Sequence, residues 1–365
     1  MNMYYRTYYM AERLQTPQFS IEDLYAGCIP ETTITEAVSK KTIRVSNIPP
    51  HWLEEADRFN AILSNFFSLN VNVEVAYTEY HIPKTKGGYR LIAAPTDELK
   101  DCLRELLKIL ERFGATAHNC AYAYIKERTC LTAIQQHQAA KTQWFYKFDL
   151  DSFFPSCTTQ LLERTLCYVY PFCIMSAQNL HNLIRLATYH GALPQGSPLS
   201  PLLSNVVLTS FDWAMYYSVR HFNGIYTRYA DDVLISFPYK KQLSFVERIV
   251  QGHLPNGLRL NQEKSRCGSV AGRNYNLGLV LNKDNNITIG HKKKMELKAK
   301  INNFIFDFTN QNYWSIIDTQ VLQGELNYFK SIEPEYAQFV IKRLEQKHHS
   351  ASLSSMFADI ISGRV

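Results

Sequence analysis

The stretch Ile225-Tyr-Thr-Arg-Tyr-Ala-Asp-Asp-Val-Leu-Ile-Ser-Phe237 contains two short apolar runs joined by a pair of adjacent acids. Residues with branched or aromatic side chains dominate Ile225–Tyr229 and Val233–Phe237, which is typical of the two strands of a hairpin. Such a hairpin places Asp231 and Asp232 on its turn. Adjacent Asp residues are often solvated turn formers, but two like charges between apolar strands are costly unless a cation lies between them. The stretch therefore predicts an acidic hairpin that binds a cation.

A second group of acids ends an alternating segment upstream, Trp144–Asp151. Its side chains alternate between an apolar face and a face that carries Lys147, Asp149 and Asp151, so we expect a half-buried strand with acids at its end. Carboxylates are ligands that Mg²⁺ prefers, and two such ions roughly 3.5–4 Å apart can activate a hydroxyl and neutralise a leaving phosphate. Asp149 and the two hairpin acids suit this role, whereas Asp151 lies roughly 6–7 Å further along and is interpreted as a strand-end acid.

Three other segments show clear periodicity. A hairpin is expected over Tyr77–Pro95 with Gly87-Gly88 at its turn, and a helix with a leucine stripe follows it. Apolar residues recur from Pro198 to Phe222 behind a Gln195-Gly-Ser-Pro198 entrance, which predicts one long core helix. From about Gly290 the chain is expected to be helical, and this part begins with a run of lysines.

The composition is that of a globular protein with a mild positive charge. The 365 residues are 46% hydrophobic and include 39 Lys and Arg against 33 Asp and Glu, a net charge of +6 that suits an anionic partner without requiring one. The 8 Cys residues are scattered with no Cys-x-x-Cys pair, so free thiols in a reducing cytoplasm are expected. No apolar run of about 18 residues occurs, so we expect a cytoplasmic protein without a membrane partner.

These segments resemble the motifs of reverse transcriptases and occur in the order of that family. Tyr229-Ala-Asp-Asp232 is similar to the Tyr-x-Asp-Asp box, and Phe148-Asp-Leu-Asp-Ser-Phe-Phe-Pro-Ser156 is similar to the first palm motif. Leu193–Asn205 resembles the second palm motif, and Gly257–Ser265 resembles the motif in which a lysine follows the catalytic acids. Leu277-Gly278 falls where the primer grip of the family is expected.

The resemblance runs from about Tyr77 to Leu281 and implies an α+β right-hand polymerase fold, with fingers, a palm that contains an antiparallel sheet, and a helical thumb. The expected boundaries are an N-terminal extension at 1–75, fingers at 76–143, a palm at 144–285 with a fingers insertion at about 157–190, and a thumb at 286–365.

The resemblance also implies roles for individual residues. The expected ligands of two Mg²⁺ ions, for which Mn²⁺ can substitute, are Asp149, Asp231, Asp232 and the backbone of Leu150. Lys264 is expected to protonate the leaving pyrophosphate, with a surface lysine as the alternative. Phe154 is expected as a steric gate that favours deoxynucleotides, while its neighbour Phe153 faces the core. The expected nucleotide pocket contains Lys84, Arg90, Phe154, Gln195 and Gly196. The expected contacts to template and primer are Tyr229, Leu277, Gly278, Lys292, Lys293, Lys294 and Lys298.

The implied activity is RNA-directed DNA polymerisation, in which a primer 3′-hydroxyl attacks the α-phosphate of a deoxynucleotide. The expected partners are dNTPs, a DNA product and a template RNA, including a dedicated noncoding RNA; a protein partner or an oligomer is left open. Ile287–Lys300 and Leu322–Tyr336 resemble retron and defence-associated bacterial enzymes. Asp151, where retron enzymes often have Lys, and Asn276-Leu-Gly278, in place of Val-Thr-Gly, favour an enzyme outside the retrons that copies a noncoding RNA in antiviral defence.

Other interpretations stay open at this level. The first is a retron reverse transcriptase that makes msDNA. An RNA-dependent RNA polymerase shares the palm arrangement, but Phe154 as a steric gate speaks against it. A template-independent or protein-primed DNA polymerase is compatible with the 23 Tyr residues. An inactive RNA-binding scaffold would keep the palm without its chemistry.

Overall fold

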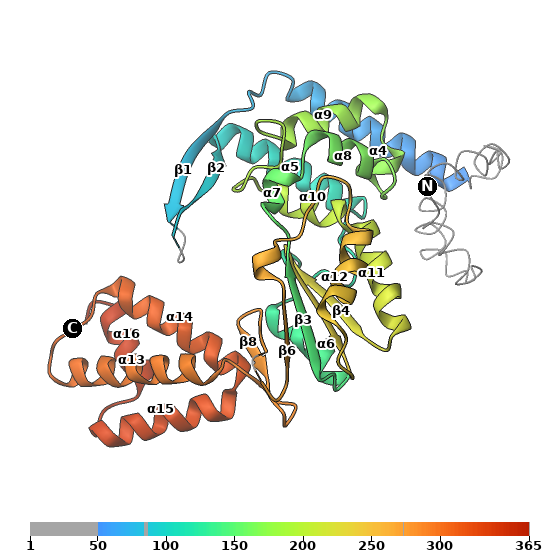
Figure 1. The fold of residues 1–365 in the computed structure, drawn as a ribbon. Coiled ribbons are helices and arrows are strands. Elements are labelled where there is room, and N and C mark those ends of the chain that lie inside the picture. The colour runs from blue at the N-terminus through green and yellow to red at the C-terminus, as the bar shows by residue number, and fades with distance from the viewer. Residues whose placement is uncertain (1–49, 84–86, 273, 365) are drawn as a thin grey trace. The chain divides into compact units, whose positions relative to one another are not determined.

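The computed structural model describes residues 50–83, 87–272 and 274–364, in two compact units (Figure 1). The first unit comprises the chain up to Ile125 together with Asp149–Ser218 and Arg248–Gln262. The second comprises Lys126–Phe148, Val219–Glu247 and Glu263–Val365. Most of the predicted N-terminal extension, residues 1–49, lies outside the described residues.

The first unit is largely helical. Its elements are α4 (Pro50–Leu69), β1 (Tyr77–Pro83), β2 (Tyr89–Pro95), α5 (Asp97–Arg112), α7 (Phe153–Ser156), α8 (Thr159–Leu166), η3 (Phe172–Ile174), α9 (Ala177–Ala187) and α10 (Ser200–Val207). Four elements run across the unit boundaries: α11 (Thr209–His221), α12 (Leu243–His253), η4 (Gln262–Lys264) and, at its last residue, β3 (Trp144–Asp149). β1 and β2 form the predicted antiparallel hairpin, and the predicted leucine stripe is buried on α5.

The second unit combines two sheets with helices. Its elements are α6 (Cys130–Ala139), β3 (Trp144–Asp149), β4 (Ile225–Tyr229), β5 (Asp232–Phe237), β6 (Arg266–Ser269), β7 (Tyr275–Asn276), β8 (Leu279–Leu281), β9 (Ile287–Thr288), α13 (His291–Thr309), α14 (Ile316–Ile332), α15 (Pro334–His348) and α16 (Leu353–Ile361). The larger sheet has the order β4-β5-β3-β6, and the smaller has the order β7-β8-β9. The expectation of helices after about Gly290 is confirmed by α13 to α16.

A single hydrophobic core connects the parts of the second unit. Ile134 of α6 and Leu234 of β5 belong to the same buried cluster as Leu279 of β8 and Phe304 of α13. Interiors of this kind are close-packed and transmit displacement rather than absorb it. The larger sheet, α6, the smaller sheet and the C-terminal helices are therefore mechanically connected within this unit.

The half-buried strand expected over Trp144–Asp151 is wrong in two respects. β3 ends at Asp149, and both of its faces are covered, because Phe145 and Tyr146 point to opposite faces and are 2% and 0% exposed. Lys147 is covered as well, because its ammonium is paired inside the protein. In β3, the alternation of polar and apolar residues therefore reflects an ion pair made by Lys147 and not a solvent-exposed face.

The single long helix expected over residues 198–222 is also wrong. The segment forms α10 and α11, and the hydrogen-bond ladder changes at Leu208, whose N–H bonds to the carbonyl of Asn205. The Asn205 side chain is itself buried and donates to the carbonyl of Ala123. The apolar period continues across this break, so periodicity alone could not reveal it.

The described cysteines are free thiols, as expected: Cys102, Cys120, Cys130, Cys157, Cys167, Cys173 and Cys267. In the part of the chain that the structure describes, none of the helices is both long enough and apolar enough to cross a bilayer.

Candidate active site

The β4–β5 hairpin holds the two adjacent acids near its tip. Its register pairs Tyr229 with Asp232, so the turn consists of Ala230 and Asp231, and Asp232 is the first residue of β5. The expectation that both acids lie on the turn is therefore wrong by one residue. Ala230 has a φ of 55°, the left-handed region that suits a two-residue hairpin turn but costs a non-glycine residue about 1–2 kcal/mol. Such strain persists only where the surroundings enforce it.

The Arg228 side chain helps to hold the turn in this conformation. It is 0% exposed, and its Nη1 donates a 3.0 Å hydrogen bond to the carbonyl oxygen of Ala230. A buried guanidinium is costly unless it is bonded, and a hydrogen bond to a charged group contributes about 1.5–3 kcal/mol. The bond therefore opposes relaxation of the strained turn and restrains the backbone that leads into Asp231.

Asp232 is paired with a lysine on the adjacent strand. The Nζ atom of Lys147 on β3 lies 2.8 Å from Oδ1 of Asp232, and the two side chains are 16% and 25% exposed. β5 and β3 are neighbours in the larger sheet. Because attraction between charges strengthens as water is excluded, the Lys147 ammonium offsets part of the negative charge that the hairpin carries.

Asp149 is the last residue of β3 and is only 8% exposed. Its carbonyl accepts a 2.8 Å hydrogen bond from the amide of Asn261, and the amide of Asp151 donates a 2.8 Å bond to the carbonyl of Arg259. These two bonds form the bridge that pairs Leu150 with Leu260, and they do not use the Leu150 carbonyl. Asp151 is exposed and lies beyond the end of the strand, in agreement with its interpretation as a strand-end acid.

In the first unit, the Gln195-Gly196 segment is joined to β2. The amide of Ala93 donates a 2.7 Å hydrogen bond to the carbonyl of Gln195. Gly196 has a φ of 127°, and a Cβ atom at this position would lie 2.5 Å from the Ala93 carbonyl oxygen, so only glycine fits. β2 also carries Arg90, which is exposed, whereas Lys84 lies outside the described residues. The Gln195-Gly196 segment is therefore joined to the strand that carries Arg90.

The two adjacent phenylalanines after β3 have different environments. Phe153 is 3% exposed, as predicted, whereas Phe154 is half-buried. The ring of Phe154 lies 6.4 Å from that of Tyr124 in an edge-to-face arrangement. Tyr124 is itself 55% exposed, so Phe154 is a partly accessible ring beside another accessible ring.

The predicted primer grip is the turn of the β7–β8 hairpin. Leu277 and Gly278 both have positive φ, at 53° and 82°, as a two-residue turn of this class requires. Lys264 ends η4 and is exposed. Lys264 therefore lies at the surface, whereas Leu277 and Gly278 are half-buried and Leu277 packs against the hydrophobic core.

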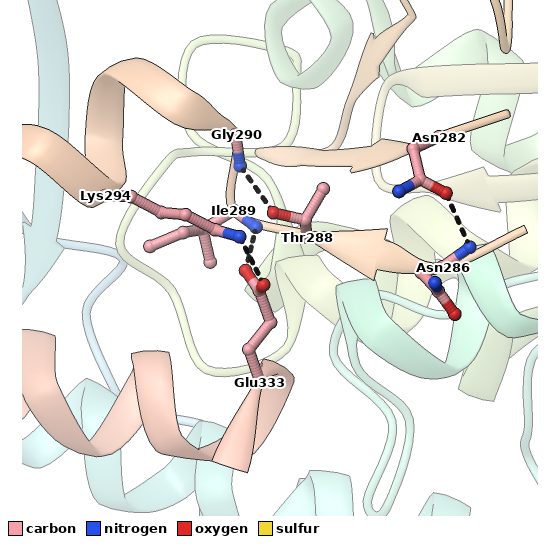
Figure 2. Close-up of polar contacts among 7 residues, drawn as sticks. All are labelled: Asn282, Asn286, Thr288, Ile289, Gly290, Lys294 and Glu333. Atoms are coloured by element: carbon pink, nitrogen blue, oxygen red, sulfur yellow. Dashed lines mark hydrogen bonds and ion pairs between the residues drawn. The ribbon is translucent and has the colours of Figure 1, made fainter. Parts of the chain in front are cut away.

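Lys294 of the predicted basic face is part of the architecture of the second unit. Its Nζ lies 2.5 Å from Oε2 of Glu333 and 4.5 Å from the ring centre of Tyr336. Glu333 also accepts a 3.0 Å hydrogen bond from the amide of Ile289, as Figure 2 shows. Glu333 therefore ties the start of α15 to the start of α13 through two different bonds.

The other lysines of that face differ in their surroundings. Lys292 is exposed and lies 3.7 Å from Glu296, and the ammonium of Lys293 lies 4.9 Å from the ring centre of Tyr328. Lys298 is half-exposed. Exposed pairs of this kind contribute about 0–1 kcal/mol to stability, so these lysines remain able to meet an anionic ligand.

Sequence reasoning did not identify three residues around the acidic hairpin as important. Lys147 was visible only as a member of the acidic face of its strand, and its partner Asp232 is far away in sequence. Arg228 could have been noticed as a charged residue inside an otherwise apolar strand. His137 gave no signal, although the structure buries it completely and joins it to β4 and β5.

The comparisons with known proteins agree with the motifs. The family model described as reverse transcriptase (RNA-dependent DNA polymerase) matches residues 82–298. The retron Ec83 reverse transcriptase of Escherichia coli is 29% identical over 290 residues, which cover 77% of this chain and 89% of that protein. The retron Ec73 reverse transcriptase of Escherichia coli is 26% identical over 272 residues, covering 71% and 84%.

A solved structure of telomerase from Candida albicans, in complex with a fragment of telomeric RNA, is also similar to this chain. It is 11% identical with a TM-score of 0.44, over 86% of this chain and 66% of that one.

The chain belongs to the reverse transcriptase family, because the family model matches more than half of the chain's residues. The predicted α+β right-hand polymerase class and the predicted RNA-directed DNA polymerase activity are thereby confirmed. Enzymes of this family use divalent metal ions and an RNA template, and they make a DNA product. Carboxylate oxygens are a suitable donor set for Mg²⁺. Among the described residues, however, no group of three acidic, histidine or cysteine side chains is gathered as a metal site.

Proposed function

We propose that this reverse transcriptase is of the retron type and copies a dedicated noncoding RNA into DNA as part of antiviral defence. The relatives with retron names, similar over most of their own length, support the retron alternative over an enzyme outside the retrons. The observation that carries the proposed chemistry is the acidic hairpin, where a strained turn with Asp231 is restrained by the buried Arg228.

The proposed metal ligands are Asp149, Asp231, Asp232 and the Leu150 carbonyl. Two Mg²⁺ ions, or Mn²⁺ in their place, would supply activation of the primer 3′-hydroxyl and neutralisation of phosphate charge when bound there. The chain's own contribution is to carry these oxygens at the ends of neighbouring strands. β3 ends at Asp149, its neighbour β5 begins with Asp232, and the turn between β4 and β5 is fixed.

The incoming deoxynucleotide is proposed to bind residues of the first unit. Arg90 and Lys84 would hold the triphosphate, since a guanidinium offers a fork of donors and an ammonium a point charge. Gly196 would allow close approach of the base pair, and Gln195 would contact the nucleotide. Phe154 would exclude a 2′-hydroxyl. Lys264 is proposed to protonate the pyrophosphate as it leaves.

Template and primer are proposed to bind along the second unit. The turn Leu277-Gly278 and the Tyr229 side chain would support the primer end, and Lys292, Lys293 and Lys298 would contact phosphates. Lys294 is proposed to act through the thumb architecture, because its ammonium is already paired with Glu333. Removing a lysine that binds a phosphate should lower the salt dependence of binding by about one unit of slope, so Lys298→Met and Lys294→Met should differ in that slope.

The proposed lobes keep the boundaries expected from the sequence. They are an N-terminal extension at 1–75, fingers at 76–143, a palm at 144–285 with a fingers insertion at about 157–190, and a thumb at 286–365.

The decisive experiment is to express the protein in its host, purify it with the nucleic acid that accompanies it, and sequence that material. The matched control is Asp231→Asn/Asp232→Asn, which keeps side-chain volume and removes the carboxylates. DNA that appears only with the intact acids, together with one discrete complementary RNA, supports the proposal. DNA bound covalently to a tyrosine would indicate protein priming, and equal RNA with no DNA in both samples would indicate a binding scaffold. Phage challenge of cells with either form tests the defence role.

A further inference from the structure

The acidic hairpin and the Leu277-Gly278 turn have to act on the same primer end, if the proposed function is correct, yet about 45 residues separate them in sequence. Both lie in the second unit. One short helix, α6, contacts β4 of the acidic hairpin, β8, which follows the Leu277-Gly278 turn, and β9. The question is what this helix does for the two hairpins.

The start of α6 is fixed by a reciprocal cap. Thr129 is the N-cap residue, and its hydroxyl accepts a 3.2 Å hydrogen bond from the amide of Thr132. In return, the hydroxyl of Thr132 accepts a 2.8 Å bond from the amide of Thr129. A double cap of this type satisfies two of the free amides at a helix start, so α6 begins at a defined residue despite its short length.

His137 joins α6 to both strands of the acidic hairpin. Its Nδ1 lies 2.5 Å from the hydroxyl of Ser236 on β5, and its Nε2 lies 2.8 Å from the hydroxyl of Thr227 on β4. The side chain is completely buried, and burial lowers its pKa to about 3. The neutral ring offers one donor and one acceptor, and a hydroxyl can serve either, so both contacts are satisfied without a buried charge.

The end of α6 is also joined to the turn between β8 and β9. The side-chain amide of Gln138 donates a 2.7 Å bond to the carbonyl of Asn285, and the side-chain amide of Asn285 donates a 3.1 Å bond to the carbonyl of Gln138. The turn is held internally too, because Oδ1 of Asn282 accepts a 2.8 Å bond from the amide of Asn286, as Figure 2 shows. The reciprocal pair therefore connects α6 to a stiff turn.

In addition to these polar contacts, α6 contributes to the hydrophobic core. Ile134 packs in the cluster that includes Leu234 of β5 and both Leu279 and Leu281 of β8. β8 begins directly after the Leu277-Gly278 turn. A change in the position of α6 would thus be transmitted to the acidic hairpin and to the primer-grip hairpin together.

We propose that α6 is the spacer that sets the separation between the acidic hairpin and the primer-grip hairpin. His137 is the positioning residue for the acidic hairpin, and the Gln138–Asn285 pair is the positioning contact for the other. Neither contact touches substrate. Their effect is on the alignment of the primer 3′-hydroxyl with the nucleotide, where a shift of about 1 Å can lower the rate about 100-fold.

The test is single-turnover incorporation of one dNTP into a DNA primer annealed to an RNA template, with the full-length protein. His137→Phe keeps an aromatic ring and removes both polar contacts. It should lower the maximal incorporation rate about 100-fold, with the amplitude of active enzyme and the dNTP concentration for half-maximal rate little changed. Thr227→Val removes one hydroxyl at constant shape, and Thr227→Ser should restore most of the rate because it returns that hydroxyl.

The second arm addresses the other contact. Asn285 has a φ of 60°, so Asn285→Gly deletes the amide side chain while keeping a residue that accepts this backbone conformation. Asn285→Gly and Gln138→Ala should each reduce the incorporation rate, and the double variant should lose more than either single variant, because each substitution removes a different one of the two hydrogen bonds. The control is Val246→Ala on α12, a buried truncation that should reduce thermal stability and leave the incorporation rate unchanged.

Three results would overturn the inference. A wild-type rate in His137→Phe would show that the hairpin does not depend on α6, and a loss of amplitude with an unchanged rate would reduce the role of His137 to stability. If the wild-type protein incorporates no dNTP on any template, the proposed function itself fails. The spacer role of α6 is then tested by hydrogen exchange. Amides of β4 and β5 that exchange as slowly in His137→Phe as in the wild type would exclude that role.

Discussion

Two antiparallel hairpins of this protein, β1–β2 and β4–β5, have opposite environments. β1 is exposed from its second residue to its last, and β2 becomes buried only toward Ala93 and Pro95. The β4–β5 hairpin is buried along nearly its whole length, with Val233 to Phe237 all inside the protein. Both hairpins carry residues proposed to act on the same nucleotide, so the difference concerns how each residue is held and not what it contacts.

An isolated two-stranded ribbon is only marginally stable in water, and its exposed half can change position at little cost. Groups that bind a triphosphate tolerate this, because long flexible side chains such as Arg90 adjust to their ligand. Carboxylates that share metal ions do not, because electrostatic stabilisation depends on groups that are already in place. Burial, the Arg228 bond and the His137 contacts supply that fixed geometry for the acidic hairpin.

The largest effect is expected from Arg228→Met, which removes the charge and keeps much of the apolar stem. The Ala230 carbonyl would lose its partner, so the free energy of unfolding should fall by about 2–3 kcal/mol. The maximal incorporation rate of the folded fraction should fall about 100-fold as the turn relaxes. Urea unfolding and single-turnover incorporation measure the two quantities. Arg248→Met, at an exposed position of α12, is the control, and equal behaviour of both variants would contradict the distinction between the hairpins.

Gly196→Ala tests the buried end of β2. The added methyl group would lie 2.5 Å from the Ala93 carbonyl oxygen, and the φ of 127° is unfavourable for alanine. We expect a loss of about 1–3 kcal/mol in unfolding free energy and a raised KM for dNTP. Gly252→Ala is the control, because it lies in α12 with nothing within 4 Å of the new Cβ and should stabilise by about 0.5–1 kcal/mol. A harmless Gly196→Ala would show that β2 and the Gln195 segment are not packed as described.

The pH dependence of stability should report on the acidic hairpin through His137. Its pKa is lowered by burial from 6.5 to about 3, so above pH 6.5 the ring is neutral in the folded and the unfolded chain. Between these values only the unfolded chain binds the proton. Stability should therefore fall as the pH falls, by about 1.4 kcal/mol per unit. His137→Phe should remove this component from urea unfolding measured between pH 7 and pH 5, and an identical slope in both proteins would disprove the assignment.

The smallest effect on the fold is expected at the exposed hairpin. Arg90→Gln should change the free energy of unfolding by less than about 0.5 kcal/mol, since the side chain is at the surface. It should raise the KM for dNTP about tenfold, which corresponds to about 1.4 kcal/mol of lost binding. Steady-state kinetics with one varied dNTP measures this. Arg112→Gln on α5 is the matched control, and an unchanged KM in Arg90→Gln would remove Arg90 from the nucleotide pocket.

The parts of the protein that local sequence determines were predicted well. Two-residue alternation indicated β3, and runs of branched and aromatic residues indicated β4 and β5. The leucine stripe indicated α5, and the order of the motifs indicated the family. These signals are local because the side-chain period and the turn chemistry are set by residues within one strand or helix. The identity of the acids could therefore be read from segments of a few residues.

Features that depend on contacts between distant segments could not be predicted. The split between α10 and α11 at Leu208 leaves the apolar period intact, and the pairing of Lys147 with Asp232 joins strands far apart in sequence. In the sequence, His137 is one polar residue of a short helix, and its role arises only when β4 and β5 pack against it. The sequence by itself determined which groups can perform the chemistry. Only the tertiary structure decided how firmly each is held, because burial and hydrogen-bond partners arise when separate segments come together.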